Sequence, residues 1–248
     1  MKIKYLKNYI YLILPGYAKH ITYLLIQLPI VSYFLDVEDI GIAALIVTFA
    51  NFLSSVFTIN TELIFQDFYV KSIKKKNKIF IFQLYISEFF TKISLVSLLI
   101  IIFLLLNLFI LTKLNPIYIW CLILSLISSS FLKLSQLNAL YGQLLKKFKI
   151  LFYADFIKII INLSSAFFFF STLKLGIISI FISTFFTAAV GLLIEFFYFF
   201  KNVNYKFEYK YLKLIFMNSK KIILSDIIFT ASDFLERFSI GYFLICVK

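Results

Sequence analysis

Seven long apolar runs divide this chain, and they constrain its fold more than any other feature. A helix needs about 20 apolar residues to cross the hydrocarbon core of a membrane, because each residue advances it by about 1.5 Å. The runs are continuous, whereas the strands of an outer-membrane barrel alternate apolar and polar residues. They occupy residues 10–35, 40–62, 93–111, 117–137, 150–173, 175–200 and 222–248. The sequence therefore predicts an all-α membrane protein with about seven transmembrane helices.

The composition excludes most other classes of protein. Hydrophobic residues make up 62% of the chain and charged residues only 15%, whereas about a quarter of an ordinary soluble domain is charged. A soluble enzyme, a disordered protein and a fibrous repeat are all excluded on this ground. In a soluble protein the net charge of +13 would suggest a nucleic-acid partner. The distribution of the lysines explains the charge differently, so we expect no nucleic acid.

The lysines lie almost entirely in alternate loops. Residues 1–8, 71–78, 146–149 and 201–221 together hold 17 lysines, whereas the segments of the opposite side hold three. Those other segments are residues 36–39, 112–116, the turn at Lys174 and the C-terminal Lys248. Lysine-rich short loops remain in the cytoplasm. We therefore expect a multi-pass protein of the cytoplasmic (inner) membrane with a cytoplasmic N-terminus, whose basic face contacts anionic lipid.

Two segments outside the seven runs need their own interpretation. Residues 79–90 are apolar and join directly to the third run, so they are expected to extend that helix beyond the membrane or to lie at the interface. Residues 205–211 alternate aromatic and charged side chains with the period of a strand, but we expect a surface linker because a lone strand has no partner.

Polar side chains form stripes inside several of these runs. Residues spaced by three and four lie on one face of a helix, and ionisable groups within a membrane usually face the interior of a bundle or a watery cavity. The stripes comprise Asn51, Ser55, Thr58 and Glu62; Ser125, Ser129, Lys133 and Gln136; Asp155, Lys158, Asn162 and Ser165; and Asp226, Thr230, Asp233 and Arg237. The first run adds Lys19 and His20.

Structural explanations compete with functional ones for these residues. Serine, threonine and asparagine can bond across helix interfaces, and lysines near helix ends can extend to water. An extension of the side chain to water suits Lys158, Lys92 and Glu62, which lie near helix ends, whereas Lys19 and Arg237 lie deeper in their runs. Glu88 and Lys92 are spaced as an ordinary helix salt bridge. We find no catalytic constellation, metal-ligand cluster or phosphate loop in the sequence, so we expect neither an enzyme nor a cofactor.

Two segments resemble a known family of transporters. The first is IVSYFLDVEDIG at residues 30–41, with Gly16 before it and Pro29, Leu35, Glu38 and Gly41 in the pattern. The second is ERFSIGYFL at residues 236–244, where Glu236 stands in place of an aspartate. Both resemble Wzx-type flippases for O-antigen and polysaccharide, within the MATE-like multidrug/oligosaccharidyl-lipid/polysaccharide exporter superfamily. Ile40 departs from the family pattern, which often has an aromatic residue there.

This resemblance implies two six-helix lobes around a cationic cavity that binds a lipid-linked oligosaccharide. It divides the chain into a six-helix N-terminal lobe (residues 1–200), a basic cytoplasmic linker (201–221) and a seventh helix that opens a second lobe (222–248). The family has about twelve or more helices, so we expect a fragment, a truncated product, or a chain that needs a second lobe or other polysaccharide-assembly proteins as partners. Half a transporter is not expected to transport alone, because alternating access moves one bundle against another.

The implied substrate is an undecaprenyl-diphosphate-linked oligosaccharide, flipped across the membrane in O-antigen, lipopolysaccharide or other cell-surface polysaccharide biosynthesis. Arginine and lysine suit a diphosphate, so the expected binding residues are Lys19, Arg237, Lys133 and Lys158. Asp155, Asp233 and Glu62 would balance these charges or carry a coupling ion. Three alternatives remain open: a MATE-like drug exporter, a non-transporting scaffold subunit that holds glycosyltransferases, and a polysaccharide polymerase, which would normally need a large external loop.

Overall fold

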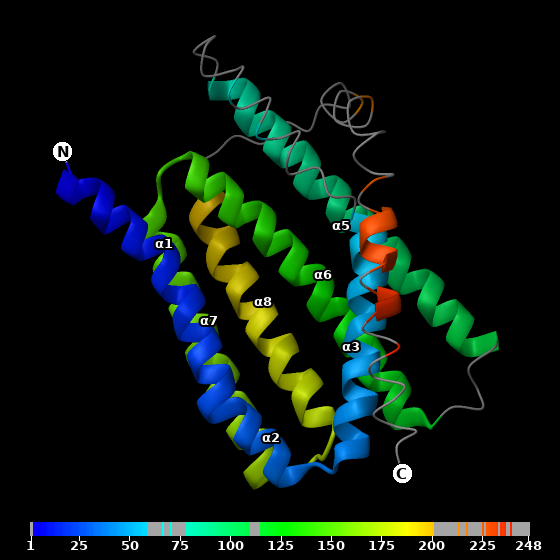
Figure 1. Cartoon of the computed structure of the whole chain (residues 1–248). Helices are drawn as coiled ribbons and strands as arrows, with labels where there is room; N and C mark the ends of the chain where they lie inside the picture. Colours follow the sequence, from blue (N-terminus) through cyan, green and yellow to red (C-terminus); the bar gives the residue numbers. More distant parts are fainter. Residues whose placement is uncertain are drawn as a thin grey trace.

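The chain folds into a bundle of long helices in a computed structural model (Figure 1). The structure describes residues 2–58, 66, 70, 78–109 and 115–200, and scattered positions between 213 and 239. Within these residues the structure is helical and contains no strand. The elements are α1 (Lys2–Thr22), η1 (Tyr23–Gln27), α2 (Leu28–Phe34), α3 (Val37–Thr58), α5 (Lys78–Phe109), α6 (Pro116–Leu144), α7 (Phe148–Phe167), η3 (Phe168–Thr172) and α8 (Ile178–Phe200).

Five of the described helices are long and apolar enough to cross a membrane. Their apolar segments are Val37–Val56, Tyr85–Ile102, Pro116–Leu144, Phe148–Thr172 and Ile178–Phe199. They confirm the prediction of an all-helical membrane protein and support a multi-pass arrangement. The first predicted span is a continuous helix from α1 through α2, interrupted only by the π-helical turn η1 just before Pro29. That helix is not among the five, and the seventh predicted span lies outside the described ranges except for scattered positions.

Helix α5 confirms that residues 79–90 continue the helix of the third predicted span. They form one helix with the third predicted span, and its 32 residues make it about 48 Å long. The hydrocarbon core is only about 30 Å thick, so α5 is longer than a single crossing requires. Residues 205–211, expected to be a linker, lie outside the part of the chain that the structure describes.

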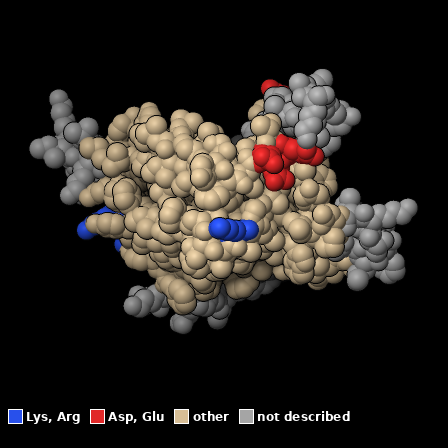
Figure 2. Space-filling model, turned by 90° about the horizontal axis from the view of Figure 1, so that it is seen from below, with Lys and Arg blue, Asp and Glu red and all other residues tan. Residues whose placement is uncertain are grey.

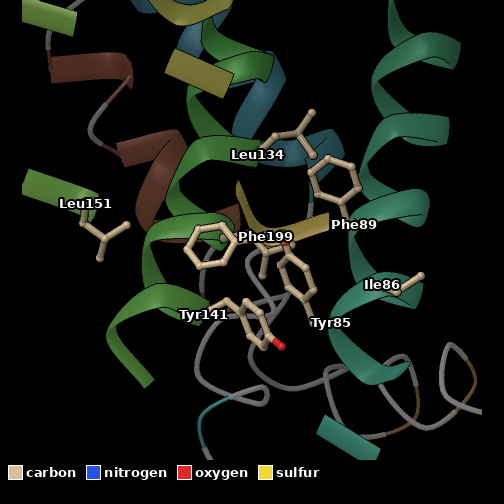
Figure 3. Packing of buried hydrophobic residues seen from close by; sticks show 8 residues of the cluster. Tyr85, Ile86, Phe89, Leu134, Tyr141, Leu151 and Phe199 are labelled. Atoms are coloured by element: carbon tan, nitrogen blue, oxygen red, sulfur yellow. The ribbon is translucent and has the colours of Figure 1, made fainter. Parts of the chain in front are cut away.

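The helices form a sequence of neighbours rather than a ring. α1 packs against α7, α7 against α8, and α8 against α6, which in turn contacts α3 and α5 (Figure 1). The apolar core lies where α5, α6, α7 and α8 meet, and its aromatic members come from three different helices: Tyr85 and Phe89 from α5, Tyr141 from α6 and Phe199 from α8 (Figure 3). A second core of mainly smaller side chains, including Cys121 and Phe181, packs α3, α6 and α8 together with η3.

The turns fall at two ends of this bundle. The start of α1, the turn between α6 and α7 and the end of α8 lie at one end, which we call the lysine-rich end (Figure 1). The α2–α3 junction and the turn before α8 lie at the other, where Lys174 and Gly176 adopt positive φ angles of 50° and 63°. Most of the surface seen from that opposite end is uncharged (Figure 2). The described turns therefore lie at alternate ends of the bundle, as predicted. Which end faces the cytoplasm stays a prediction.

Candidate functional site: a buried ionic cluster

A lysine near the middle of α7 reaches across the interface to the neighbouring helices. The Nζ atom of Lys158 lies 2.5 Å from Glu195 Oε1, 2.9 Å from Ser135 Oγ and 3.0 Å from Asp155 Oδ1. Its side chain is only 15% exposed. The ammonium therefore donates to three oxygens from three helices: α8, α6 and α7 itself. The expectation that Lys158 extends to water is wrong, because its charge is satisfied inside the bundle.

The main partner of the lysine is a glutamate on α8. The Glu195 side chain is 1% exposed, and both of its oxygens accept hydrogen bonds. Oε1 accepts from Lys158 and, at 2.8 Å, from the hydroxyl of Ser135, and Oε2 accepts from Asn138 Nδ2 at 3.2 Å. A carboxylate taken out of water needs such donors, because its desolvation is otherwise too costly.

The hydrogen bonds continue to α5 through a tyrosine. Tyr85 donates its phenolic hydrogen to Asn138 Oδ1, so the asparagine amide connects the phenol to the glutamate. The Tyr85 ring is fully buried and stacks on Tyr141 with 4.1 Å between ring centroids (Figure 3). We call the group of Tyr85, Ser135, Asn138, Asp155, Lys158 and Glu195 the Lys158 cluster. It joins four helices, each of which contains one of the five apolar segments.

A glycine on α8 makes room for the lysine. Gly191 lies one helical turn before Glu195, and a Cβ atom added there would be 2.3 Å from Lys158 Cε and 2.9 Å from its Cδ and Cγ. The aliphatic part of the lysine therefore lies directly on the α8 backbone. Any other residue at position 191 would occupy the path by which the ammonium reaches Glu195.

The cluster is unevenly charged and lies nearer the lysine-rich end of the bundle. Two carboxylates surround one ammonium, which leaves one negative charge in excess when all three groups are ionised. Asp155 is one turn closer to the α6–α7 turn than Lys158, and its side chain is 47% exposed. Glu195 lies five residues before the end of α8. The cluster therefore runs from a half-exposed carboxylate to a buried one.

A second ion pair is buried within α5 alone. Lys92 Nζ lies 3.5 Å from Glu88 Oε1, which confirms the predicted salt bridge at this spacing. Both side chains are nearly inaccessible, with 4% and 3% exposure, so the expectation that Lys92 extends to water is wrong. This pair contains one charge of each sign, in contrast to the Lys158 cluster.

Other predicted polar stripes serve the packing of α3 against α6. The hydroxyl of Ser129 donates to Asn51 Oδ1 at 2.8 Å. The hydroxyls of Ser54 and Ser130, which are not part of the predicted stripes, lie 3.2 Å apart. These contacts are the interhelical bonds expected of small polar residues in a membrane bundle. Asn162, on the predicted stripe of α7, does not join the cluster. Its Oδ1 atom is buried without a hydrogen-bond partner among the described residues.

The structure brings two of the seven predicted site residues together. Asp155 and Lys158 form an ion pair, Lys133 is partly buried two residues before Ser135, and Lys19 is exposed on α1. Glu62, Asp233 and Arg237 lie outside the described residues. Sequence reasoning missed Glu195, Ser135, Asn138 and Tyr85. Glu195 carried a usable signal, because it is the only charged residue in the predicted span 175–200.

Similarity to other proteins does not assign the chain to a family. Searches against protein families, characterised proteins and solved structures give no match. The function must therefore be inferred from the residues of the chain itself. Among the described residues, no three histidine, cysteine, aspartate or glutamate side chains come together as a metal site would require. The cluster contains an ammonium within hydrogen-bonding distance of two carboxylates and a hydroxyl group. Such groups can bind and release protons and can change hydrogen-bond partners.

Proposed function

We propose that the protein translocates undecaprenyl-diphosphate-linked oligosaccharide across the cytoplasmic membrane for cell-surface polysaccharide biosynthesis. The observation that supports a transport function best is the Lys158 cluster, in which Lys158 and Glu195 are held inside apolar helices. Ionisable groups within a membrane are costly and usually mark substrate or ion pathways. A scaffold that only holds other enzymes at the membrane surface has no need of such groups.

In this proposal the predicted cations have different tasks. Lys19 is exposed on α1, and with Arg237 and Lys133 it would hold the diphosphate. Lys158 is already paired with two carboxylates, so we assign it to charge balance within the lobe and not to first contact with the substrate. A MATE-like arrangement of two six-helix lobes, with the second lobe supplied from outside the described helices, would complete the cavity.

One feature of the cluster favours a second candidate, a MATE-like exporter of small organic cations. Asp155 and Glu195 outnumber Lys158, and an exporter of cations requires an acidic site. The predicted diphosphate-binding lysines argue for the flippase. The two functions differ in what moves across the membrane, and one experiment separates them.

The experiment is deletion of the gene in its own host, with the unaltered gene restored on a plasmid as the control. A flippase predicts loss of surface polysaccharide together with accumulation of lipid-linked oligosaccharide, because synthesis continues while translocation stops. A scaffold predicts that both decrease, and an exporter of cations predicts unchanged polysaccharide with increased retention of a lipophilic fluorescent cation. Unchanged levels of both polysaccharide and lipid-linked precursor would refute the proposed function.

A further inference from the structure

We infer that Glu195 binds a proton in exchange for its contact with Lys158, with Asp155 as the group that connects the site to water. The inference deepens the proposed transport function, because it names an ion that the protein would bind. Proton binding itself is a property of the cluster and can be measured without any transported substrate. The inference rests on the geometry and the charge balance of the Lys158 cluster.

The first step concerns the charge that the cluster must hold. With Asp155, Lys158 and Glu195 all ionised, one negative charge is in excess, and Glu195 is almost completely removed from solvent. Lys158 divides its single positive charge between the half-exposed Asp155 and the buried Glu195, so the charge of Glu195 is only partly compensated, which a low-dielectric interior disfavours. Binding one proton makes the group neutral: Glu195 becomes a carboxylic acid, and Lys158 and Asp155 remain as a balanced ion pair.

The second step concerns the hydrogen bonds around Glu195, which can accommodate the proton. Ser135 Oγ lies 2.8 Å from Glu195 Oε1, and a hydroxyl group can either donate or accept. When Oε1 carries the proton, this bond reverses: the carboxylic acid donates and the serine oxygen accepts. Asn138 continues to donate to Oε2, and the hydroxyl hydrogen of Ser135 can turn to the backbone carbonyl oxygen of Phe131, four residues earlier in α6, a bond that helical serines commonly make.

The third step concerns the lysine, which changes partners. Its bonds to Glu195 and Ser135 weaken on protonation, because the carboxylate is neutral and the serine oxygen accepts another hydrogen. Its bond to Asp155, at 3.0 Å on the same helix, persists. Lys158 would thus move from the α7–α8 interface toward the half-exposed Asp155, and the ion pair between these two helices would be lost. The proton would enter from water through Asp155, which is half-exposed and lies in the second turn of α7, close to the α6–α7 turn.

Among the residues that the structure describes, few charged groups lie around Glu195. Lys158 pairs with it directly, Asp155 faces it across the lysine, and the titratable phenol of Tyr85 is connected through Asn138. Lys133 of α6 is two residues from Ser135, a spacing that puts it on a different side of the helix. On α5, Glu88 and Lys92 pair with each other. Glu88 is therefore the reference residue: a second buried glutamate that forms an ion pair with a lysine.

The test is infrared difference spectroscopy of the full chain in lipid nanodiscs as the pH is lowered from about 8 to about 5. A buried carboxylic acid has a carbonyl band that is distinct from the bands of a carboxylate. We expect this band to grow on acidification in the unaltered protein, to be lost in Glu195→Gln, and to persist in Glu88→Gln. Absence of the band, or its persistence in Glu195→Gln, would overturn the inference.

A second variant keeps the test decisive if Glu195→Gln does not fold. Asp155→Asn removes the excess negative charge at a half-exposed position, so the band of Glu195 should form only at a lower pH than in the unaltered protein. An unchanged pH midpoint would show that Asp155 does not share its charge with the site and would overturn the inference. Either spectroscopic failure leaves the gene-deletion experiment on polysaccharide export unaffected, so the two proposals fail separately.

Discussion

Lys158 Nζ on α7 lies 2.5 Å from Glu195 Oε1 on α8, and no charged residue besides Glu195 lies in the apolar segment Ile178–Phe199. The two side chains come from adjacent helices joined by a short turn, so the contact fixes the rotation of one helix against the other. Removal of Lys158 leaves the buried carboxylate of Glu195 without a counter-ion, which usually costs about 3–5 kcal/mol, whereas removal of Glu195 leaves the lysine paired with Asp155. Replacement of Lys158 alone is therefore expected to lower the free energy of unfolding more than replacement of both members together.

Replacement of the two residues, singly and together, tests this expectation. Lys158→Met should lower the free energy of unfolding by about 3 kcal/mol, because it leaves the buried carboxylate of Glu195 without a counter-ion. Glu195→Gln should lower it less, because Lys158 keeps its ion pair with Asp155. The double variant should lose less than the sum of the two. Denaturant titration in detergent micelles measures all three. Additive losses would show that the ion pair contributes nothing as a unit.

Gly191→Ala tests whether the close approach of the lysine to α8 matters. The new methyl group would lie 2.3 Å from Lys158 Cε, so the lysine must leave its position or the helices must separate. The variant should lower the unfolding free energy by about 1–3 kcal/mol, the usual cost of overpacking. In the Lys158→Ala background the same change should be nearly neutral, because the obstructing side chain is gone.

Gly16→Ala is the matched control for Gly191→Ala. It too is a helical glycine, but an added Cβ would meet nothing within 4 Å. Alanine is the better helix former by about 0.5–1 kcal/mol, so this change should be neutral or stabilising. Equal effects of the two substitutions would argue against a specific contact between Gly191 and Lys158.

Tyr85→Phe tests the extension of the cluster to α5. The substitution removes the hydroxyl that donates to Asn138 and leaves a buried oxygen without that donor, while the stacking on Tyr141 is preserved. We expect a loss of about 1–3 kcal/mol in unfolding free energy. Tyr17→Phe, at an exposed position of α1, should change it little. If both variants behave alike, the phenol of Tyr85 is not part of the functional network.

The apolar runs predicted the helices well because a membrane leaves few alternatives. The predicted segments 150–173 and 175–200 correspond closely to α7 with η3 and to α8. Backbone groups in lipid must bond within their own helix, so a sufficiently long apolar run has little choice of structure. The helix α6 extends seven residues beyond the predicted 117–137, and Asn138, Tyr141 and Gly142 of this extension are buried in the bundle.

The cluster itself could be predicted only in part. Spacing by three placed Asp155 and Lys158 on one face of α7, as the structure confirms. Spacing within one helix does not determine which neighbour that face meets, so the partners Glu195, Ser135 and Asn138 could not follow from periodicity. Their meeting depends on the packing of α7, α8 and α6, and on the small size of Gly191.

The predicted diphosphate contacts remain to be tested through export. Lys19 is exposed on α1, so Lys19→Ala removes a charge without opening a cavity and should leave the amount of protein in the membrane unchanged. If Lys19 binds the diphosphate, the variant should lose surface polysaccharide in cells that depend on this gene, and Arg237→Ala should do the same. Lys147→Ala is the control, because that lysine is exposed in the α6–α7 turn, outside the apolar segments. Normal export in both Lys19→Ala and Arg237→Ala would exclude these two residues as the diphosphate site, since loss of a charge-assisted bond to phosphate is expected to weaken binding at least tenfold, or about 1.4 kcal/mol.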